Sequence, residues 1–233
     1  MDIEKLVNSK VYTFFDWLWR IFVLNILTMV TSLGIITAFP SIVSCFQSIK
    51  DCKEGSDESI FKVYFRNFGA YFKKTVGMGI IIIVVTLILV YGVIFYTDLL
   101  KAMVEEGPDV YTDAQMAFPT IGKYIVFFLI FVLGLIVNQL PIIYSYFNFR
   151  FFDNFKFALY TTFKFIGKGL MEILCWGLSV VVFILLTPAW FFIGISGPLF
   201  LIYSISRPIY WYLANSKDVV NHDKNIEEKE KGL

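Results

Sequence analysis

Five long runs of apolar residues alternate along the chain with shorter segments that carry most of its charged residues. Each run approaches the ~20 residues that a helix needs to cross the hydrocarbon core of a bilayer. The spans expected from this pattern are residues 21–39, 75–96, 124–140, 170–191 and 195–213. The boundary between the last two is the least distinct, because Pro188 interrupts the apolar run. The pattern predicts an all-α, polytopic membrane helix bundle with about five transmembrane helices.

The composition agrees with a membrane protein. Hydrophobic residues make up 58% of the chain and 26 residues are Phe, whereas soluble domains average ~45–50% apolar residues. We therefore expect the lipid bilayer as the main partner of a single transmembrane domain over residues 1–215. The net charge of +1 gives no electrostatic reason to expect nucleic acid. The tail, residues 216–233, is charged and almost free of large apolar residues, which is typical of a disordered segment.

Two of the polar segments carry an amphipathic helical pattern. In "IFKVYFRNFGAYFKKT" (60–75) and "FFDNFKFALYTTFKFIGKG" (151–169), apolar residues recur at every third or fourth position. We expect helices that lie in the membrane interface or pack under the bundle. The alternative is that each segment is the amphipathic start of the next span. Their basic side chains are candidate docking residues for a partner: Lys62, Arg66, Lys73, Lys74, Lys156 and Lys164.

The distribution of Lys and Arg predicts an orientation for a multi-pass protein of the cell membrane. With five spans, the segments 50–74 and 148–169 lie on the same side as the C-terminal region that begins at Arg207, and these three regions hold 15 of the 20 basic residues. The loop 97–122 on the other side is acidic. Because basic loops stay in the cytoplasm, we expect an outside N-terminus and a cytoplasmic C-terminus.

A short motif occurs twice and involves two prolines inside apolar runs. "PSIVSCF" (40–46) and "PIIYSYF" (141–147) share Pro, Ile, Ser and Phe, and each proline closes a predicted span. This predicts two duplicated hairpins plus a fifth span, with the copies related by an axis along the membrane normal. Pro40 and Pro141 are the expected helix breaks, serving as a simple kink or as a moving hinge. Thr37 is close enough to bond the backbone groups that Pro40 frees.

The most notable polar residues inside the predicted spans are the four with an amide or carboxyl group. Asn25, Asn138, Gln139 and Glu172 are candidates for interhelical hydrogen bonds or for a substrate path. Glu172 follows Lys168 by four residues, so a local ion pair at the membrane interface would account for it. No spacing of Ser, His, Asp, Glu or Cys matches a catalytic or metal-binding motif. We expect no enzyme activity, no metal and no cofactor.

The stretch "LNILTMVTSLGIITAFPSIVSCFQSIK" (24–50) resembles the signature of the YesL family of bacterial membrane proteins. The matching residues are Asn25, Thr37 and Pro40, while Gly34 stands where the family usually has proline, a change expected to straighten the span. The family has a domain of unknown function, and in Gram-positive bacteria its genes often lie beside carbohydrate ABC importers. The resemblance implies an accessory subunit of oligosaccharide uptake, with ABC permease subunits, the ATPase or a sugar-binding protein as partners. It implies no catalytic residues.

Two other functions remain open at the level of the sequence. One is a stand-alone small-solute transporter with a path between the two hairpin repeats, although the spans lack a string of charged residues. The other is an ABC permease itself. Such permeases engage their ATPase through a Glu-Ala-Ala loop followed by glycine. Here "FALYTTFKFIGKG" has Ala158 and Gly167 but lacks the acidic residue.

Overall fold

The computed structural model describes residues 10–56, 58–106 and 111–215, and these residues form eight α-helices and one 3₁₀ turn. The predicted all-α fold is thus confirmed, while the disorder predicted for 216–233 lies outside the described residues. The elements, in chain order, are α2 (Lys10–Thr31), η1 (Ile35–Thr37), α3 (Ala38–Lys53), α4 (Ile60–Glu105), α5 (Asp113–Tyr146), α6 (Phe151–Lys164), α7 (Ile166–Leu185), α8 (Thr187–Ile193) and α9 (Ser196–Ala214).

The length and hydropathy of the helices make this a multi-pass membrane protein. Four helices, α2, α4, α5 and α7, are long and apolar enough to cross a bilayer. The pair α8 and α9, which is bent by 52°, provides a fifth span if it is counted as one. Four or five spans agree with the predicted number. The orientation of the chain in the membrane stays a prediction.

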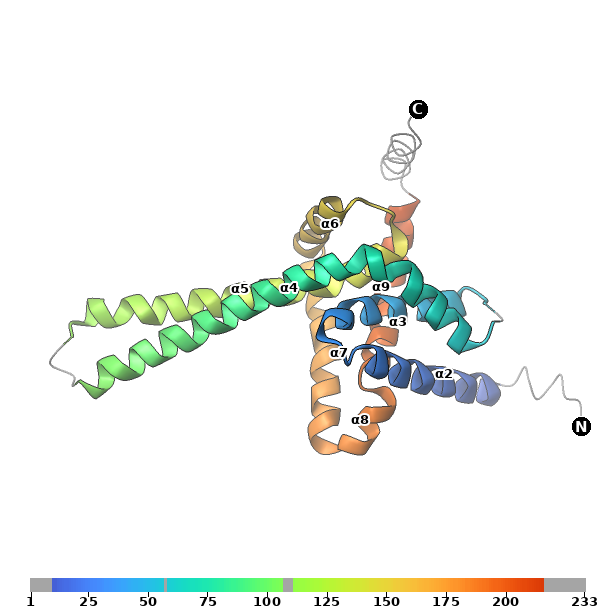
Figure 1. Ribbon diagram of the computed structural model, residues 1–233, viewed down its shortest axis with the longest axis horizontal. Coiled ribbons are helices and arrows are strands. Elements are labelled where there is room, and N and C mark those ends of the chain that lie inside the picture. Colours follow the sequence, from blue (N-terminus) through green and yellow to red (C-terminus); the bar gives the residue numbers. More distant parts are fainter. Residues whose placement is uncertain (1–9, 57, 107–110, 216–233) are drawn as a thin grey trace, which may run out of the picture.

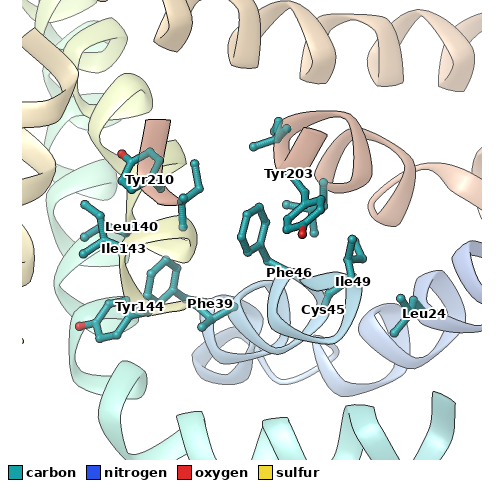
Figure 2. Packing of buried hydrophobic residues seen from close by; sticks show 14 of the residues in the cluster. Leu24, Phe39, Cys45, Phe46, Ile49, Leu140, Ile143, Tyr144, Tyr203 and Tyr210 are labelled. Carbon is teal, nitrogen blue, oxygen red and sulfur yellow. The ribbon is translucent and has the colours of Figure 1, made fainter. Parts of the chain in front are cut away.

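The core is built around α3, which packs against α2, α4, α5 and α9. Ten of its sixteen residues are buried. Figure 2 shows Phe46 of α3 facing Tyr203 of α9, and their ring centroids lie 5.9 Å apart. The serines of α3 are buried too, because each hydroxyl donates to a backbone carbonyl one turn earlier: Ser41 to Thr37, Ser44 to Pro40 and Ser48 to Ser44.

The predicted first span, 21–39, is wrong at its C-terminal end. Helix α2 stops at Thr31, and after the η1 turn the chain begins a new helix at Ala38. Pro40 is therefore the third residue of α3 and does not close a span. The first turn of a helix has no internal acceptor for its N–H groups, so proline costs little there. Gly34 does not straighten the chain either, since it lies within the break between the two helices.

The segment 60–75 is not a separate interfacial helix. It is the start of α4, which runs without interruption for 46 residues, or about 69 Å at 1.5 Å per residue. The alternative interpretation of this segment is the correct one. In Figure 1, α4 and α5 form a long hairpin whose far end extends away from the other helices.

The second half of the chain departs from the prediction at two boundaries and contains one of the predicted amphipathic helices. Helix α5 continues through Pro141 to Tyr146, so this proline does not end the span. The amphipathic segment does form its own helix, α6, which is separated from α7 at Phe165. The fourth span ends at Leu185 and not at 191, because α8 begins with the pair Thr187 and Pro188. The repeat keeps one local feature, since Ser145 donates to the carbonyl of Pro141 as Ser44 does to that of Pro40.

Candidate functional site

A buried polar network joins α5, α7 and α9, and Glu172 is at its centre. The Glu172 carboxylate accepts from Gln139 Nε2 at 2.6 Å and from the Ser206 hydroxyl at 2.9 Å. The Tyr210 hydroxyl in turn donates to Gln139 Oε1 at 2.5 Å. All four side chains are at least 98% buried. The network brings together two residues that the sequence predicted, Gln139 and Glu172, although they are 33 residues apart.

Lys168 lies next to this network but does not form the predicted ion pair with Glu172. Its ammonium group is 3.4 Å from the backbone carbonyl oxygen of Ser206, to which it donates. It also lies 4.5 Å from the centroid of the Tyr210 ring, within the range of a cation–π interaction. The Lys168 side chain thus contacts α9, which packs beside α7. Both oxygens of Glu172 accept hydrogen bonds from neutral donors, and such a saturated network stabilises helix packing.

Asn25 of α2 has a different role, because it bonds the backbone where α8 gives way to α9. Its Oδ1 accepts from the N–H groups of Ile195 and Ser196, at 2.7 and 3.1 Å. Its Nδ2 donates to the carbonyl oxygen of Phe191 at 2.7 Å. Asn25 has no exposed surface. A single amide side chain therefore replaces backbone hydrogen bonds that the 52° bend removes.

Two serines complete the bonding of the same bend. The Ser179 hydroxyl of α7 donates to the carbonyl oxygen of Gly194 at 2.5 Å and accepts from Trp190 Nε1 at 3.1 Å. The Ser196 hydroxyl donates to the carbonyl oxygen of Ile21 at 2.7 Å. The bend is consequently held from both sides, by α2 and by α7.

The other predicted polar residues lie apart from these two clusters. The Thr37 hydroxyl is 2.5 Å from the carbonyl oxygen of Thr31 and 2.6 Å from that of Gly34, so it bonds the break between α2 and α3. Asn138 lines an apolar cleft of about 300 Å³ between α3, α5, α7 and α9. Within the described part of the chain, its side chain makes no hydrogen bond.

A comparison with known protein families finds a match for one segment of the chain. Residues 17–93 match the family described as "Protein of unknown function, DUF624". They form a DUF624 domain. The match covers about a third of the chain and includes Asn25, Thr37 and Pro40. No curated protein and no solved structure matches the chain. All four residues of the Glu172 network lie outside the DUF624 domain.

Two of the basic residues of the DUF624 domain are held by internal ion pairs. Lys62 Nζ lies 2.9 Å from a Glu58 carboxylate oxygen, and Arg66 pairs with Glu58 and, at 3.4 Å, with Asp51. The hydrogen bond from Lys62 lowers the pKa of Glu58. Asp51 also accepts from Asn67 at 2.9 Å. Arg66 therefore links the start of α4 to Asp51 at the end of α3, whereas the Lys62–Glu58 pair is local to the start of α4.

The remaining basic candidates are exposed at the surface. Lys73 and Lys74 follow each other on α4 inside the DUF624 domain, and Lys156 and Lys164 lie on α6, beyond it. Lys164 donates to the Tyr160 hydroxyl at 2.7 Å. Lys74 donates to Asn148 Oδ1 at 3.2 Å. These four lysines present positive charge on two elements, α4 and α6.

Several residues of both clusters escaped the sequence analysis. Ser206 and Tyr210 bond the Glu172 network, and Ser179 and Ser196 bond the bend, yet none has a charge or a motif that marks it. One signal was available, since serine on a membrane helix often bonds across to a neighbour. Within residues 10–56, 58–106 and 111–215, no three His, Cys, Asp or Glu side chains gather closely enough to hold a metal ion.

Proposed function

We propose that this protein is a non-enzymatic accessory subunit of a bacterial carbohydrate ABC importer, and that it binds its partner through the far half of the α4–α5 hairpin. The observation that carries the proposal is the surface of that hairpin. In the most apolar stretch of α4, only 11% of the residues are buried. The outward apolar side chains include Leu87, Ile88, Tyr91, Ile94 and Phe95 of α4, and Tyr124, Phe127 and Phe128 of α5.

Transmembrane helices of a permease would pack on this face through van der Waals contacts, which drive helix association in a bilayer. The hairpin projects beyond the helices that form the core, so a partner has access to both of its helices (Figure 1). The resemblance to the YesL family supplies the class of partner. The intramembrane polar groups favour the same function, because those around Glu172 bond one another and do not line an open path.

A second candidate is a stand-alone small-solute transporter. The bent pair α8–α9 favours it, because transporters commonly bind their substrates at interrupted membrane helices. In this chain, however, Asn25 and Ser179 already bond the backbone groups at the bend. The cleft beside the bend, of about 270 Å³, has an almost entirely apolar lining.

The deciding experiment is purification of the tagged, full-length protein from native membranes in a mild detergent, with identification of the bound proteins by mass spectrometry. An accessory subunit is expected to bring down ABC permease subunits of a carbohydrate importer in near-equal amounts. Recovery of this chain alone would contradict the proposal and favour the stand-alone transporter.

Bulky apolar substitutions would locate the contact without disturbing the fit to lipid. We expect Ile88→Trp on α4 to reduce recovery of the permease several-fold. The matched control is Leu174→Trp on α7, a residue that is equally apolar and, at 71%, even more exposed. Equal recovery with both variants would exclude the α4 face as the contact.

A further inference from the structure

A polar cleft of about 600 Å³ opens where α5 ends and α6 begins, next to α4. Its size lies in the range of roughly 300–1,000 Å³ that is typical of ligand sites. Its position matters, because the membrane span of α5 ends at Tyr146, within the lining. The lining includes Lys73 and Lys74 of α4, Tyr144 and Tyr146 of α5, and Asn154 of α6.

The charge of this cleft is positive. Lys73 and Lys74 are both exposed and both line it, and no residue of the lining is acidic. Helix α6 begins at Phe151, no side chain caps its first turn, and that turn carries one acidic residue, Asp153, which is not part of the lining. The N-terminus of a helix carries a partial positive charge, which Asp153 offsets in part, so the two lysines supply most of the positive charge of the cleft. The cleft is therefore suited to an anion.

Three buried polar atoms of the lining have no hydrogen-bond partner among the described residues: the Tyr144 and Tyr146 hydroxyls and Asn154 Oδ1. Tyr144 is 7% exposed and Asn154 is 1% exposed. Figure 2 shows the Tyr144 hydroxyl pointing away from Phe39 and the rest of the core cluster. Leaving buried polar atoms unpaired is unfavourable, and native proteins rarely do so without a ligand, water or ion.

The chemistry of these groups is complementary to one class of ligand. A hydroxyl donor and two ammonium groups match a phosphate, while the Asn154 carbonyl matches a hydroxyl group carried beside it. We propose that this cleft binds a phosphate ester of a polyol, with Lys73 and Lys74 on the phosphate, Tyr144 donating to it and Asn154 accepting from the polyol. The position at the end of a membrane span fits a phospholipid headgroup. A soluble polyol phosphate has the same chemistry.

Binding can be measured with full-length protein purified in a neutral detergent, using short-chain phosphatidylglycerol, short-chain phosphatidylcholine, glycerol phosphate and inorganic phosphate as probes. We expect phosphatidylglycerol to bind, and Lys73→Gln with Lys74→Gln to weaken its binding about tenfold or more. The matched control, Lys62→Gln with Lys156→Gln, loses the same formal charge outside the cleft and is expected to change the affinity less than about twofold.

Tyr144→Phe separates binding from folding. It removes an unpartnered hydroxyl, so the ligand-free variant should melt at the same temperature as the parent or higher, while its affinity for phosphatidylglycerol falls about fivefold. Competition by glycerol phosphate would support the site and assign it to a soluble ligand; its absence would assign the site to lipid. Failure of every probe to bind, or equal losses in the cleft and control variants, would overturn the proposal, whatever the outcome for the ABC partner.

Discussion

At the scale of single residues, Asn25 is the side chain whose loss should be most costly. Asn25→Ala leaves the carbonyl of Phe191 and the N–H of Ile195 without partners in an apolar setting. We expect a loss of about 2–6 kcal/mol in unfolding free energy, at about 1–3 kcal/mol for each of the two unpaired groups. Detergent-based unfolding of the purified protein measures it. Asn138→Ala is the control, and an equal loss in both variants would contradict this role of Asn25.

Glu172 permits a second prediction at this scale. Glu172→Leu leaves Gln139 Nε2 and the Ser206 hydroxyl without their acceptor, and should cost about 3 kcal/mol. Glu172→Gln should cost about 1 kcal/mol, because its amide oxygen still accepts one bond and the Ser206 hydroxyl can rotate to accept another. The same unfolding assay compares the two variants. Equal stability of Glu172→Leu and the parent would show that the network does not hold α5, α7 and α9 together.

At the scale of elements, the close approach of α4 to α3 depends on Gly79. A Cβ atom at this position would lie 2.9 Å from the Cβ of Phe39. Gly79→Ala should therefore destabilise the protein by about 1–3 kcal/mol through overpacking. Gly134→Ala in α5 is the matched control, since no atom lies within 4 Å of its added Cβ. Improved helix propensity should stabilise that variant by about 0.5–1 kcal/mol, and similar unfolding midpoints for the two would contradict the argument.

The elements also show where sequence reasoning succeeds. The spans were predictable because long apolar runs have few other solutions in a protein of this size. The buried helix α3 was not predictable, because its serines make the segment look polar. Only the structure shows that their hydroxyls are bonded to backbone carbonyls one turn earlier. The prediction that Pro40 and Pro141 each close a span was wrong for a related reason. Pro40 marks the start of a helix and Pro141 lies inside one, and a proline's effect depends on its position in the helix.

At the scale of the whole molecule, the sites depend on registers between helices that are distant in sequence. Gln139 and Glu172 were singled out individually, because amide and carboxyl groups inside spans are unusual. The hydrogen bond from Ser206 to Glu172 requires α7 and α9 to be aligned to within one helical turn. Asn25 likewise meets Ile195 across 170 residues. Hydropathy fixes neither alignment, so sequence reasoning identified two of the four residues of the Glu172 network and one of the three side chains that bond the bend.

The orientation of the molecule yields the last prediction. If the basic segments face the cytoplasm, a cysteine replacing Lys156 on α6 should react with a membrane-impermeant maleimide only after the cells are opened. A cysteine replacing Lys101, near the end of α4, should react in intact cells, because its side chain is 70% exposed on the opposite side.

The native thiols give little background in this experiment. Cys45, Cys52 and Cys175 are all buried. Burial raises the pKa of Cys45 to about 12 and also raises that of Cys52, so little reactive thiolate forms at neutral pH. The reverse labelling pattern would show that the chain has the opposite orientation in the membrane, with Lys73 and Lys74 outside the cell. It would then remove the ATPase from the set of partners that the α4 and α6 lysines can reach, because that subunit works in the cytoplasm.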